Sequence, residues 1–349
     1  MKHNKLALLE RLEQTHTLST DEYAALIDAF SPEFAELAAQ KANALRRQVY
    51  GNAVFIRGLI EIGNVCKNDC YYCGIRRSNA ACTRYRLTQE EILECCREGY
   101  PLGFRTFVMQ GGEGGSLTVE EACAAVRAIK AEFPDCAVTL SLGEYPTEAY
   151  RAMREAGADR YLLRHETADP IHYAKLHPPE LSWDNRMRCL ADLKALGFQV
   201  GCGFMVGSPF QTTEALAKDL KFVETFAPDM CGIGPFIPHK DTPFAHHEAG
   251  SVELTLFLLS LLRLIRPNLL LPATTALGSL RGDGRERGIC AGANVVMPNL
   301  SPQKAKENYT LYNNKLTTGA EAAQNLADLK ARMAAIGYEI VSARGDIQK

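Results

Sequence analysis

The sequence has little of what marks several functional classes of protein. Its 39 basic and 41 acidic side chains nearly cancel, and a net charge of −2 gives no sign of a nucleic acid or an anionic membrane as a partner. The longest apolar run, residues 254–265, is interrupted by Ser260 and Arg263 and is too short to span a bilayer. No segment is of low complexity and no repeat is recognisable. We therefore expect neither nucleic acid nor a membrane among its partners.

We also expect no secretory leader at the start of this sequence. Charged residues are scattered among the apolar ones of residues 1–14, which predicts a helix and not a signal peptide. The 12 cysteines then favour a reducing compartment, and we expect a cytoplasmic protein. With 46% hydrophobic and 23% charged residues, the chain has the composition of an ordinary globular protein with an ample core.

Residues 4–49 are predicted to form three short helices. Leu6, Leu8, Leu9 and Leu12 are expected to form one helical stripe. Ser19 and Glu22 form a Ser-x-x-Glu capping box, and a proline at position 32 opens the third helix. We expect residues 1–50 to be a helical extension packed on the remainder of the chain, residues 51–349. The alternative is a separate small domain.

From residue 52 onward, short apolar runs rich in β-branched residues alternate with amphipathic segments. The runs cover residues 55–64, 106–112, 137–143, 160–166, 199–207, 230–238, 268–276 and 293–299. The helical segments begin near residues 88, 118, 147, 183, 213, 252 and 278, and a last helix is expected over residues 319–336. Thr88 with Glu91, and Thr118 with Glu121, form further capping boxes.

This alternation predicts an α/β fold, a (β/α)8 TIM-type barrel with an N-terminal helical extension and a C-terminal helix. Connections of this length suit right-handed crossovers between parallel strands. An open, doubly wound sheet would use the same alternation. We favour the closed barrel because no Gly-x-Gly-x-x-Gly follows the first run.

Three cysteines, Cys66, Cys70 and Cys73, lie in a predicted loop directly after the first strand. Three thiolates suit a [4Fe–4S] cluster in which one iron stays open for a small molecule. A zinc site needs a fourth ligand, which Cys82 or a histidine could supply. A zinc-stabilised barrel that binds a partner without turnover is therefore an alternative from a different class.

Polar residues gather where the predicted strands end, which is where barrel enzymes carry their chemistry. In the fourth strand, Arg160, Arg164 and Glu166 share one face because side chains alternate along a strand. Burying two arginines and a glutamate is costly unless they are paired or bind a charged ligand. A ligand site is favoured because three strands supply polar groups at this level, and a structural layer of ion pairs is the alternative.

The cysteine spacing, with Tyr72 before the last cysteine, resembles the signature of radical S-adenosylmethionine (SAM) enzymes. Several further segments are similar to the HydE family, the radical SAM maturases of [FeFe]-hydrogenase. They are residues 74–79, 84–86, 140–144, 158–167, 233–239, 272–276 and 292–299. The resemblance extends from residue 52 to residue 315. It implies an enzyme that reductively cleaves SAM to a 5′-deoxyadenosyl radical during maturation of the hydrogenase active site.

This resemblance also implies a set of cofactor ligands. Cys66, Cys70 and Cys73 would hold the cluster, and SAM would be bound by Tyr72, Gln110, Ser141, Glu166, Arg186 and Tyr309. Some family members carry three more cysteines near the C-terminus for an accessory cluster, but residues 311–323 contain none. We therefore expect one cluster only, with the other nine cysteines acting as small buried hydrophobic residues.

The substrate implied by the resemblance is a small iron–cysteine species that carries carbonyl and cyanide. We expect it deeper in the barrel, at Thr139, Arg160, Arg164, Met230, Thr274 and Thr275, with Arg164, Thr274 and Thr275 as candidate catalytic residues. The implied partners are a tyrosine-lyase-type radical SAM maturase, a GTPase scaffold and a reductant protein. A methylornithine synthase-like radical SAM mutase is the alternative within the enzymes. Biotin synthase fits less well, since ligands for an auxiliary cluster are not evident.

Overall fold

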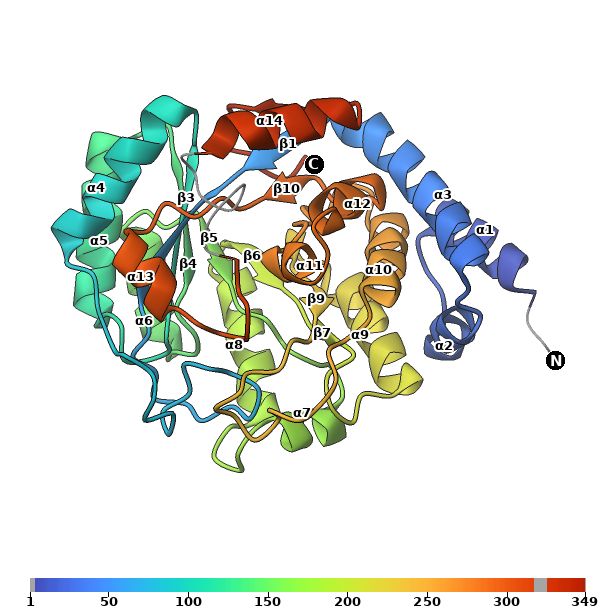
Figure 1. The fold of residues 1–349 in the computed structure, drawn as a ribbon, viewed down its shortest axis with the longest axis horizontal. Coiled ribbons are helices and arrows are strands. Elements are labelled where there is room, and N and C mark those ends of the chain that lie inside the picture. Colours follow the sequence, from blue (N-terminus) through green and yellow to red (C-terminus); the bar gives the residue numbers. More distant parts are fainter. Residues whose placement is uncertain (1–3, 317–324, 349) are drawn as a thin grey trace.

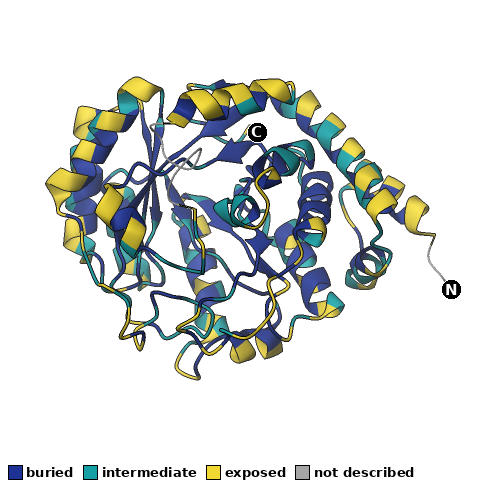
Figure 2. Cartoon of the chain, viewed as in Figure 1, coloured by how far each residue is buried: buried dark blue, intermediate teal, exposed yellow. Residues whose placement is uncertain are grey.

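The computed structural model describes residues 4–316 and 325–348. Helices form an outer ring around short strands, with the N-terminal helices attached at one side (Figure 1). The strands are buried, whereas the helices are exposed on their outer faces and buried where they face the strands (Figure 2). This is the layering expected when amphipathic helices cover an apolar sheet.

Three helices open the chain: α1 (Lys5–Thr15), α2 (Thr20–Asp28) and α3 (Pro32–Tyr50). They match the three predicted helices, and the predicted capping box of α2 is present. Helix α2 packs on α9 (Thr213–Phe226), and α3 packs along α10 (Val252–Ile265). The division of the chain into domains after residue 50 stays a prediction.

Six parallel strands pair in the order in which they occur along the chain. They are β2 (Gly58–Gly63), β3 (Thr106–Gly111), β4 (Ala137–Ser141), β5 (Arg160–Leu162), β6 (Gln199–Cys202) and β8 (Met230–Cys231). Two further short strands, β7 (Met205–Val206) and β9 (Gly234–Pro235), pair with each other beyond the ends of β6 and β8. The strands predicted over residues 199–207 and 230–238 are therefore each interrupted in the middle.

Single parallel bridges complete the ring. Met230 pairs with Leu270, and Pro272 pairs with Val295. A last bridge joins Asn299 to Leu59 in β2, so the backbone contacts return to the first strand. The predicted closed parallel barrel is thus confirmed, although the seventh run, residues 268–276, contributes bridges and no continuous strand.

The helices of the barrel begin where the sequence predicts them. They are α4 (Gln89–Gly99), α5 (Val119–Glu132), α6 (Thr147–Glu155), α8 (Trp183–Ala195), α9 and α10. The capping boxes at Thr88 and Thr118 are both present. Two short helices, α11 (Thr275–Leu280) and α12 (Gly284–Cys290), replace the single helix predicted from residue 278.

Several short elements were not predicted from the sequence. They are the 3-10 helix η1 (Tyr100–Leu102), α7 (Pro170–Leu176), α13 (Gln303–Asn308) and strand β11 (Glu339–Val341). The last helix, α14, covers Leu326–Ala335, and the start of the predicted helix at residues 319–324 lies outside the described residues.

Strand β11 extends the sheet at the amino ends of the barrel strands. It pairs in parallel with β1 (Ala53–Ile56), whose other edge pairs with β10 (Val295–Val296). Strand β1 leads directly into β2, so one continuous segment holds both the C-terminal strand and the barrel ring. The residues after β11 consequently lie across the amino-terminal end of the barrel.

Arg160 lies at this end, and the structure contradicts its predicted role in substrate binding. Its side chain is fully buried at the start of β5 and donates to Thr106 Oγ1 at 2.9 Å and to Gln199 Oε1 at 3.0 Å. The third nitrogen, Nη2, donates to the Arg344 carbonyl at 2.8 Å and to Asp346 Oδ1 at 2.6 Å. Every nitrogen of the guanidinium thus has a protein partner, and Arg160 forms part of a closed floor.

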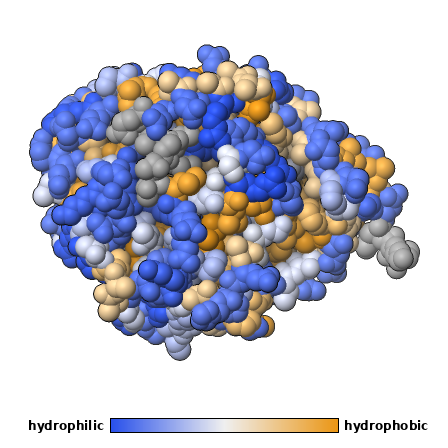
Figure 3. Space-filling model, viewed as in Figure 1, coloured by the Kyte–Doolittle hydropathy of each residue, from blue (hydrophilic) through white to orange (hydrophobic). Residues whose placement is uncertain are grey.

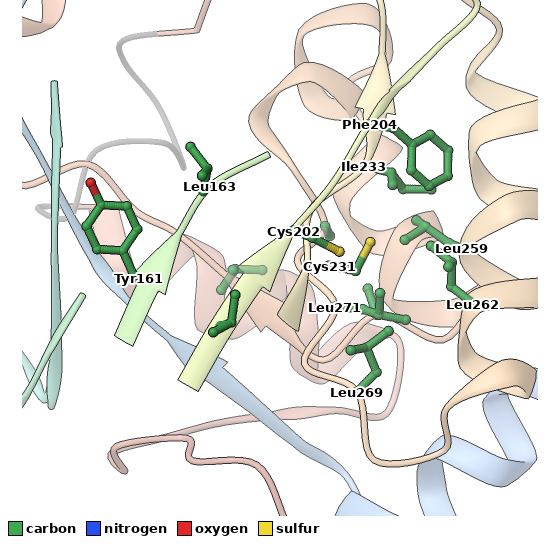
Figure 4. Close-up of a cluster of buried hydrophobic side chains, with 14 of the residues drawn as sticks. Tyr161, Leu163, Cys202, Phe204, Cys231, Ile233, Leu259, Leu262, Leu269 and Leu271 are labelled. Atoms are coloured by element: carbon green, nitrogen blue, oxygen red, sulfur yellow. The ribbon is translucent and has the colours of Figure 1, made fainter. Parts of the chain in front are cut away.

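Most of the remaining cysteines behave as predicted. Seven of them are buried: Cys95, Cys96, Cys123, Cys136, Cys189, Cys202 and Cys231. Cys202 and Cys231 are register partners on β6 and β8 and lie in the core near Leu259 and Leu262 of α10 (Figure 4). Cys82 and Cys290 are only partly buried, and all 12 cysteines are free thiols in the structure.

Hydrophilic residues dominate the rim of the face seen in Figure 3, and several hydrophobic residues are visible nearer its centre. Over residues 4–316 and 325–348, no helix has both the length and the apolar composition that crossing a membrane requires.

The contact of Asp346 with the floor generates a prediction about stability. Partial burial raises the pKa of Asp346, but the bonds from Arg344 and the charge of Arg160 outweigh it and hold the pKa below its usual range. A depressed pKa stabilises the fold fully above the unfolded-state pKa of about 3.9, and the contribution is lost progressively as the pH falls from there through the lower folded-state pKa. Asp346→Asn should therefore lower stability at pH 7 by about 1–2 kcal/mol, a value discounted for partial exposure.

Urea denaturation at pH 7 and pH 3 measures this effect. The difference between the parent protein and Asp346→Asn should be present at pH 7 and shrink at pH 3. Asp328→Asn, a change at an exposed carboxylate of α14, is the matched control and should have little effect. An equal loss of stability at both pH values would contradict the assignment.

Candidate active site

The cysteine loop lies between β2 and α4 at the carboxyl ends of the strands, and three other segments anchor it. Cys66 forms an antiparallel bridge with Gly114 in the loop after β3. The Tyr71 amide donates to the Leu176 carbonyl at 3.0 Å, and the Gly74 amide donates to the Leu311 carbonyl at 2.9 Å. These contacts place the thiols at the mouth of the barrel, opposite the floor.

Polar side chains that follow the cysteines fold the loop upon itself. Arg76 Nε bonds to Asp69 Oδ1 at 2.7 Å, and Asn79 Nδ2 donates to the Gly74 carbonyl at 2.7 Å. Arg84 Nη1 donates to the Ile75 backbone carbonyl at 2.7 Å and to the Asn64 backbone carbonyl at 2.6 Å. The residues 74–79 and 84–86 that carry the resemblance therefore hold the shape of the loop.

Glycines allow other segments to approach the loop closely. A Cβ atom added at Gly112 would lie 2.3 Å from the Val65 carbonyl oxygen. One added at Gly74 would lie 2.0 Å from the Thr310 carbonyl oxygen. Neither distance is possible for a real side chain, so both positions require glycine. The cysteine loop is consequently fixed between the strand ends and residues 308–316.

The three thiols suit a metal cluster. Burial raises the pKa of Cys66, and it raises the pKa of Cys73 to about 12 with a further contribution from Cys66. For Cys70, burial and then the charges of Cys73 and Cys66 raise the pKa well above its usual value. Cys66, Cys70 and Cys73 are partly buried and close enough to oppose one another's ionisation. Such thiols are stabilised as thiolates when a cationic metal centre replaces their protons.

The single-ion alternative finds no support among the described residues. No three His, Cys, Asp or Glu side chains in that part of the chain are arranged to hold one metal ion. Ligands of a cubane cluster each bind a different iron, so they need not converge on one point.

Three of the predicted SAM residues lie around the thiols. Burial raises the pKa of Tyr72 well above its usual value, and the charges of Cys70, Glu166 and Cys73 raise it further. Arg186 lowers the pKa of both Tyr72 and Cys70. These mutual effects require proximity, so the structure brings Tyr72, Glu166 and Arg186 to the cysteine loop.

The other three predicted SAM residues lie on the adjacent strands and on the segment that crosses the mouth. Gln110 in β3 is the register partner of Ser141 in β4. Gln110 Nε2 donates to the Tyr309 hydroxyl at 3.3 Å, and Tyr309 is almost fully buried. The six predicted residues thus face one region, and their binding role stays a prediction.

Partner residues that the sequence did not single out complete this region. Arg186 Nε lies 2.5 Å from Glu144 Oε1, and both side chains are buried. The Tyr72 hydroxyl lies 3.2 Å from His177 Nε2. Glu144 follows the third predicted strand and could have been chosen for that reason. His177 carries no such signal, because only the fold brings it to the tyrosine.

A buried ion pair also holds the segment that crosses the mouth. Lys315 Nζ pairs with Glu61 Oε1 of β2 and donates to the Tyr309 carbonyl at 2.9 Å. The Lys315 and Glu61 side chains are 7% and 0% exposed, so the charges are largely shielded from water. This pair fixes the backbone beside Tyr309, and the sequence gives no indication of it.

Several polar atoms inside the barrel, from the level of Thr139 to the mouth, lack a hydrogen bond within the protein. Among the described residues, Thr139 Oγ1 and two Arg164 nitrogens, Nε and Nη2, are buried without a hydrogen bond. Arg164 Nη2 lies 3.2 Å from Glu166 Oε2 in an ion pair. Buried polar atoms without partners are costly and mark a place where a ligand can supply the missing bonds.

The last predicted substrate residues lie at different depths. Thr274 Oγ1 donates to the Ile233 carbonyl at 3.2 Å, and Thr275 begins helix α11. Met230 begins β8 and receives a hydrogen bond from the buried Arg57, so it lies near the floor. Substrate binding by Thr139, Arg164, Met230, Thr274 and Thr275 stays a prediction.

Glu166 has an unusual backbone conformation, with φ at +64°. An L-residue in this region costs on the order of 1–2 kcal/mol. The Glu166 amide donates to the Gly203 carbonyl at 2.9 Å, which secures the turn. The strain lies at the residue where the strand end presents a carboxylate to the cysteine loop.

Comparisons with known proteins agree with this geometry. The model of the Radical SAM superfamily matches residues 60–223. The chain is 46% identical over 283 residues to the [FeFe] hydrogenase maturase subunit HydE of Thermotoga maritima, covering 81% of this chain and 80% of that protein. It is 28% identical over 332 residues to the 3-methylornithine synthase of Methanosarcina acetivorans, covering 95% of this chain and 92% of that protein.

The fold agrees as well. A crystal structure of methylornithine synthase superposes with a TM-score of 0.80 at 26% identity, covering 96% of this chain and 97% of that one. The identity to the maturase is much higher than the identity to the synthase, which favours the maturase over the mutase alternative. The chain therefore belongs to the radical SAM superfamily and, within it, to the HydE-type maturases of [FeFe]-hydrogenase.

Proposed function

We propose that this maturase holds one [4Fe–4S] cluster on Cys66, Cys70 and Cys73 and cleaves SAM beside it to act on a small iron–cysteine carbonyl and cyanide species. The observation that carries the proposal is the shared position of the three thiols and the Arg164–Glu166 ion pair at one mouth of the barrel. Membership of the radical SAM superfamily implies the cluster and SAM. Their number and their ligands are part of this proposal.

The cluster and SAM supply a one-electron reduction of the sulfonium, which gives methionine and a 5′-deoxyadenosyl radical. The chain has to bind a cationic sulfonium and amino group together with an anionic carboxylate. Glu166 and the Glu144–Arg186 pair offer both signs of charge in a buried site. Electrostatic interactions there are stronger than in water, because little solvent screens them.

The nucleoside part of SAM would lie between aromatic and amide groups. Tyr309 offers a buried ring and Tyr72 a partly exposed one on opposite segments, and Gln110 and Ser141 offer hydrogen-bonding groups on neighbouring strands. This arrangement keeps the reacting part of the cofactor out of water. Exclusion of water protects a radical from side reactions.

The substrate would lie beyond SAM, nearer the barrel centre. The unbonded nitrogens of Arg164 and the unbonded hydroxyl of Thr139 favour an anionic, hydrogen-bonding ligand such as a cyanide- and carboxylate-bearing complex. Thr274 and Thr275 line the same mouth from the seventh barrel segment. Exchange with a tyrosine-lyase-type maturase, a GTPase scaffold and a reductant protein belongs to the same proposal.

The first test of this proposal concerns the cluster. Cys70→Ala should abolish cluster assembly and SAM cleavage, because two thiolates do not retain a cubane. Iron and sulfide are measured after anaerobic reconstitution, with about four irons expected for the parent protein. Cys82→Ala is the matched control and should keep the full iron content. Full deoxyadenosine production by Cys70→Ala would refute the assignment.

A second test concerns SAM binding. Glu166→Ala should weaken binding by at least about tenfold, because it removes a buried charged partner of the cofactor. Equilibrium dialysis of the reconstituted protein measures the dissociation constant. Glu180→Ala, which removes an exposed glutamate near the same loop, should leave the constant unchanged. Unchanged affinity in Glu166→Ala would remove Glu166 from the cofactor site.

A third test concerns the substrate. Arg164→Met should keep the cluster and SAM binding but cleave SAM without converting substrate, because the cation that orients the substrate is lost. Deoxyadenosine formation is compared with hydrogenase activation in a strain that lacks the native gene. Arg188→Met, at a partly exposed arginine of α8, is the control. Normal activation by Arg164→Met would exclude Arg164 from the substrate site.

A further inference from the structure

The turn that carries Arg164 and Glu166 extends β5 beyond its last ladder residue. The Leu163 amide donates to the Gly201 carbonyl and the Glu166 amide to the Gly203 carbonyl, both at 2.9 Å. Glu166 also forms a parallel bridge with Phe204. The turn therefore follows the chain between β6 and β7 and places two charged side chains at the mouth.

His165 lies between these two residues, and its side chain points to the opposite face, as alternation along a strand requires. Its ring lies 4.6 Å from the Phe222 ring of α9 and 5.7 Å from the Phe204 ring, measured between centroids. The side chain is fully buried. His165 thus occupies the layer between the barrel strands and α9, outside the proposed binding region.

Hydrogen bonds fix the protonation state and orientation of this ring. The Gly203 amide donates to His165 Nδ1 at 3.2 Å, so Nδ1 is an acceptor and the proton is on Nε2. His165 Nε2 then donates to Asp219 Oδ1 at 3.2 Å. The same carboxylate oxygen accepts from the Ala168 amide at 2.5 Å. The His165–Asp219 pair is consequently bonded to the backbone of the turn at Ala168 and to the neighbouring segment at Gly203.

A purely structural role explains this pair poorly. Asp219 is fully buried on α9, and burial raises its pKa well above the usual value. Burial likewise lowers the pKa of His165 to about 3. Apolar residues of similar size would fill the same space without this cost. What they could not do is bond to Gly203 and Ala168 and so hold the turn in a left-handed conformation at Glu166.

We propose that His165 and Asp219 are positioning residues for the reaction. They hold the turn so that the Arg164 guanidinium and the Glu166 carboxylate point side by side to bound SAM and substrate. The inference rests on the proposed function of Arg164 and Glu166. It adds to that function two residues that contact neither ligand and act through the backbone.

The decisive variant is Asp219→Leu, which fills the same space without an acceptor. It should keep the iron content of the parent protein, weaken SAM binding at least tenfold and raise the deoxyadenosine formed per hydrogenase activated. Asp219→Asn keeps the Oδ1 acceptor for Ala168 and His165, and it should restore the affinity to within threefold of the parent. A structural role alone would not produce this difference between two folded variants.

A matched control distinguishes the loss of a buried polar group from the loss of positioning. His172 of α7 is also buried and lies close enough to Asp219 to affect its pKa, but it bonds to the Pro209 carbonyl at 3.0 Å and not to the turn. His172→Leu should keep the SAM affinity and the coupling of the parent. Parental affinity and coupling in a folded, iron-loaded Asp219→Leu would overturn the proposal.

Two further measurements keep the test decisive. If Asp219→Leu does not accumulate, His165→Asn is used, which retains an acceptor for Gly203 but cannot reach Asp219. Unchanged affinity and coupling in that variant would likewise overturn the proposal. Glu166→Ala is measured in parallel. If Glu166→Ala weakens SAM binding but the Asp219 variants bind SAM like the parent protein, only the positioning role is refuted. If Glu166→Ala binds SAM like the parent protein, the proposed function of Glu166 is refuted.

Discussion

The pairing of residues 53–63 on both edges is the interaction on which the rest of the structure depends. Strand β1 bonds to β10 and β11, and β2 bonds to β3 and, through Leu59, to Asn299. This one segment therefore closes the ring and fixes the direction of every other strand. Because all the strands are parallel, their carboxyl ends share one mouth, and the cysteine loop begins where β2 ends.

Arg160 and Arg164 are satisfied by the protein to different degrees. At the floor, Arg160 has protein partners for each of its nitrogens, including Asp346. At the mouth, Arg164 retains two buried nitrogens without a hydrogen bond. Both arginines lie on the inner face of the same strand, four residues apart. Arg57, near the floor, also retains two buried nitrogens without a hydrogen bond, so the contrast is between Arg160 and Arg164 themselves and not between the two ends of the barrel.

The local features of the fold were predictable from the sequence. Capping boxes at Ser19, Thr88 and Thr118 fixed helix starts because each uses contacts within four residues. The alternating runs predicted the strands, and the cysteine spacing predicted the loop. Hydrophobic periodicity reports which face of an element is buried, and this information is local.

The errors and omissions share a different physical cause. Arg160 was misassigned because its partners include residues 344 and 346, which return from the far end of the chain to the floor. The Lys315–Glu61 and Tyr72–His177 contacts were missed for the same reason. A side chain's direction can be predicted from strand alternation, but whether its polar atoms are satisfied depends on segments distant in the sequence. The proposed roles of the mouth residues depend on that distinction.

The position of β11 has a consequence for how the protein is made. Its register partners in β1, Ala53 to Phe55, are separated from it by nearly the whole described chain. During synthesis, β1 keeps one bare edge, and the guanidinium of Arg160 lacks its carboxylate partner, until residues 339–346 have left the ribosome. Pairings of such long range form slowly, and an unpaired strand edge invites association with other chains. A chain whose synthesis stops before this point would therefore form an open barrel that is prone to aggregation, even when its cysteine loop is complete.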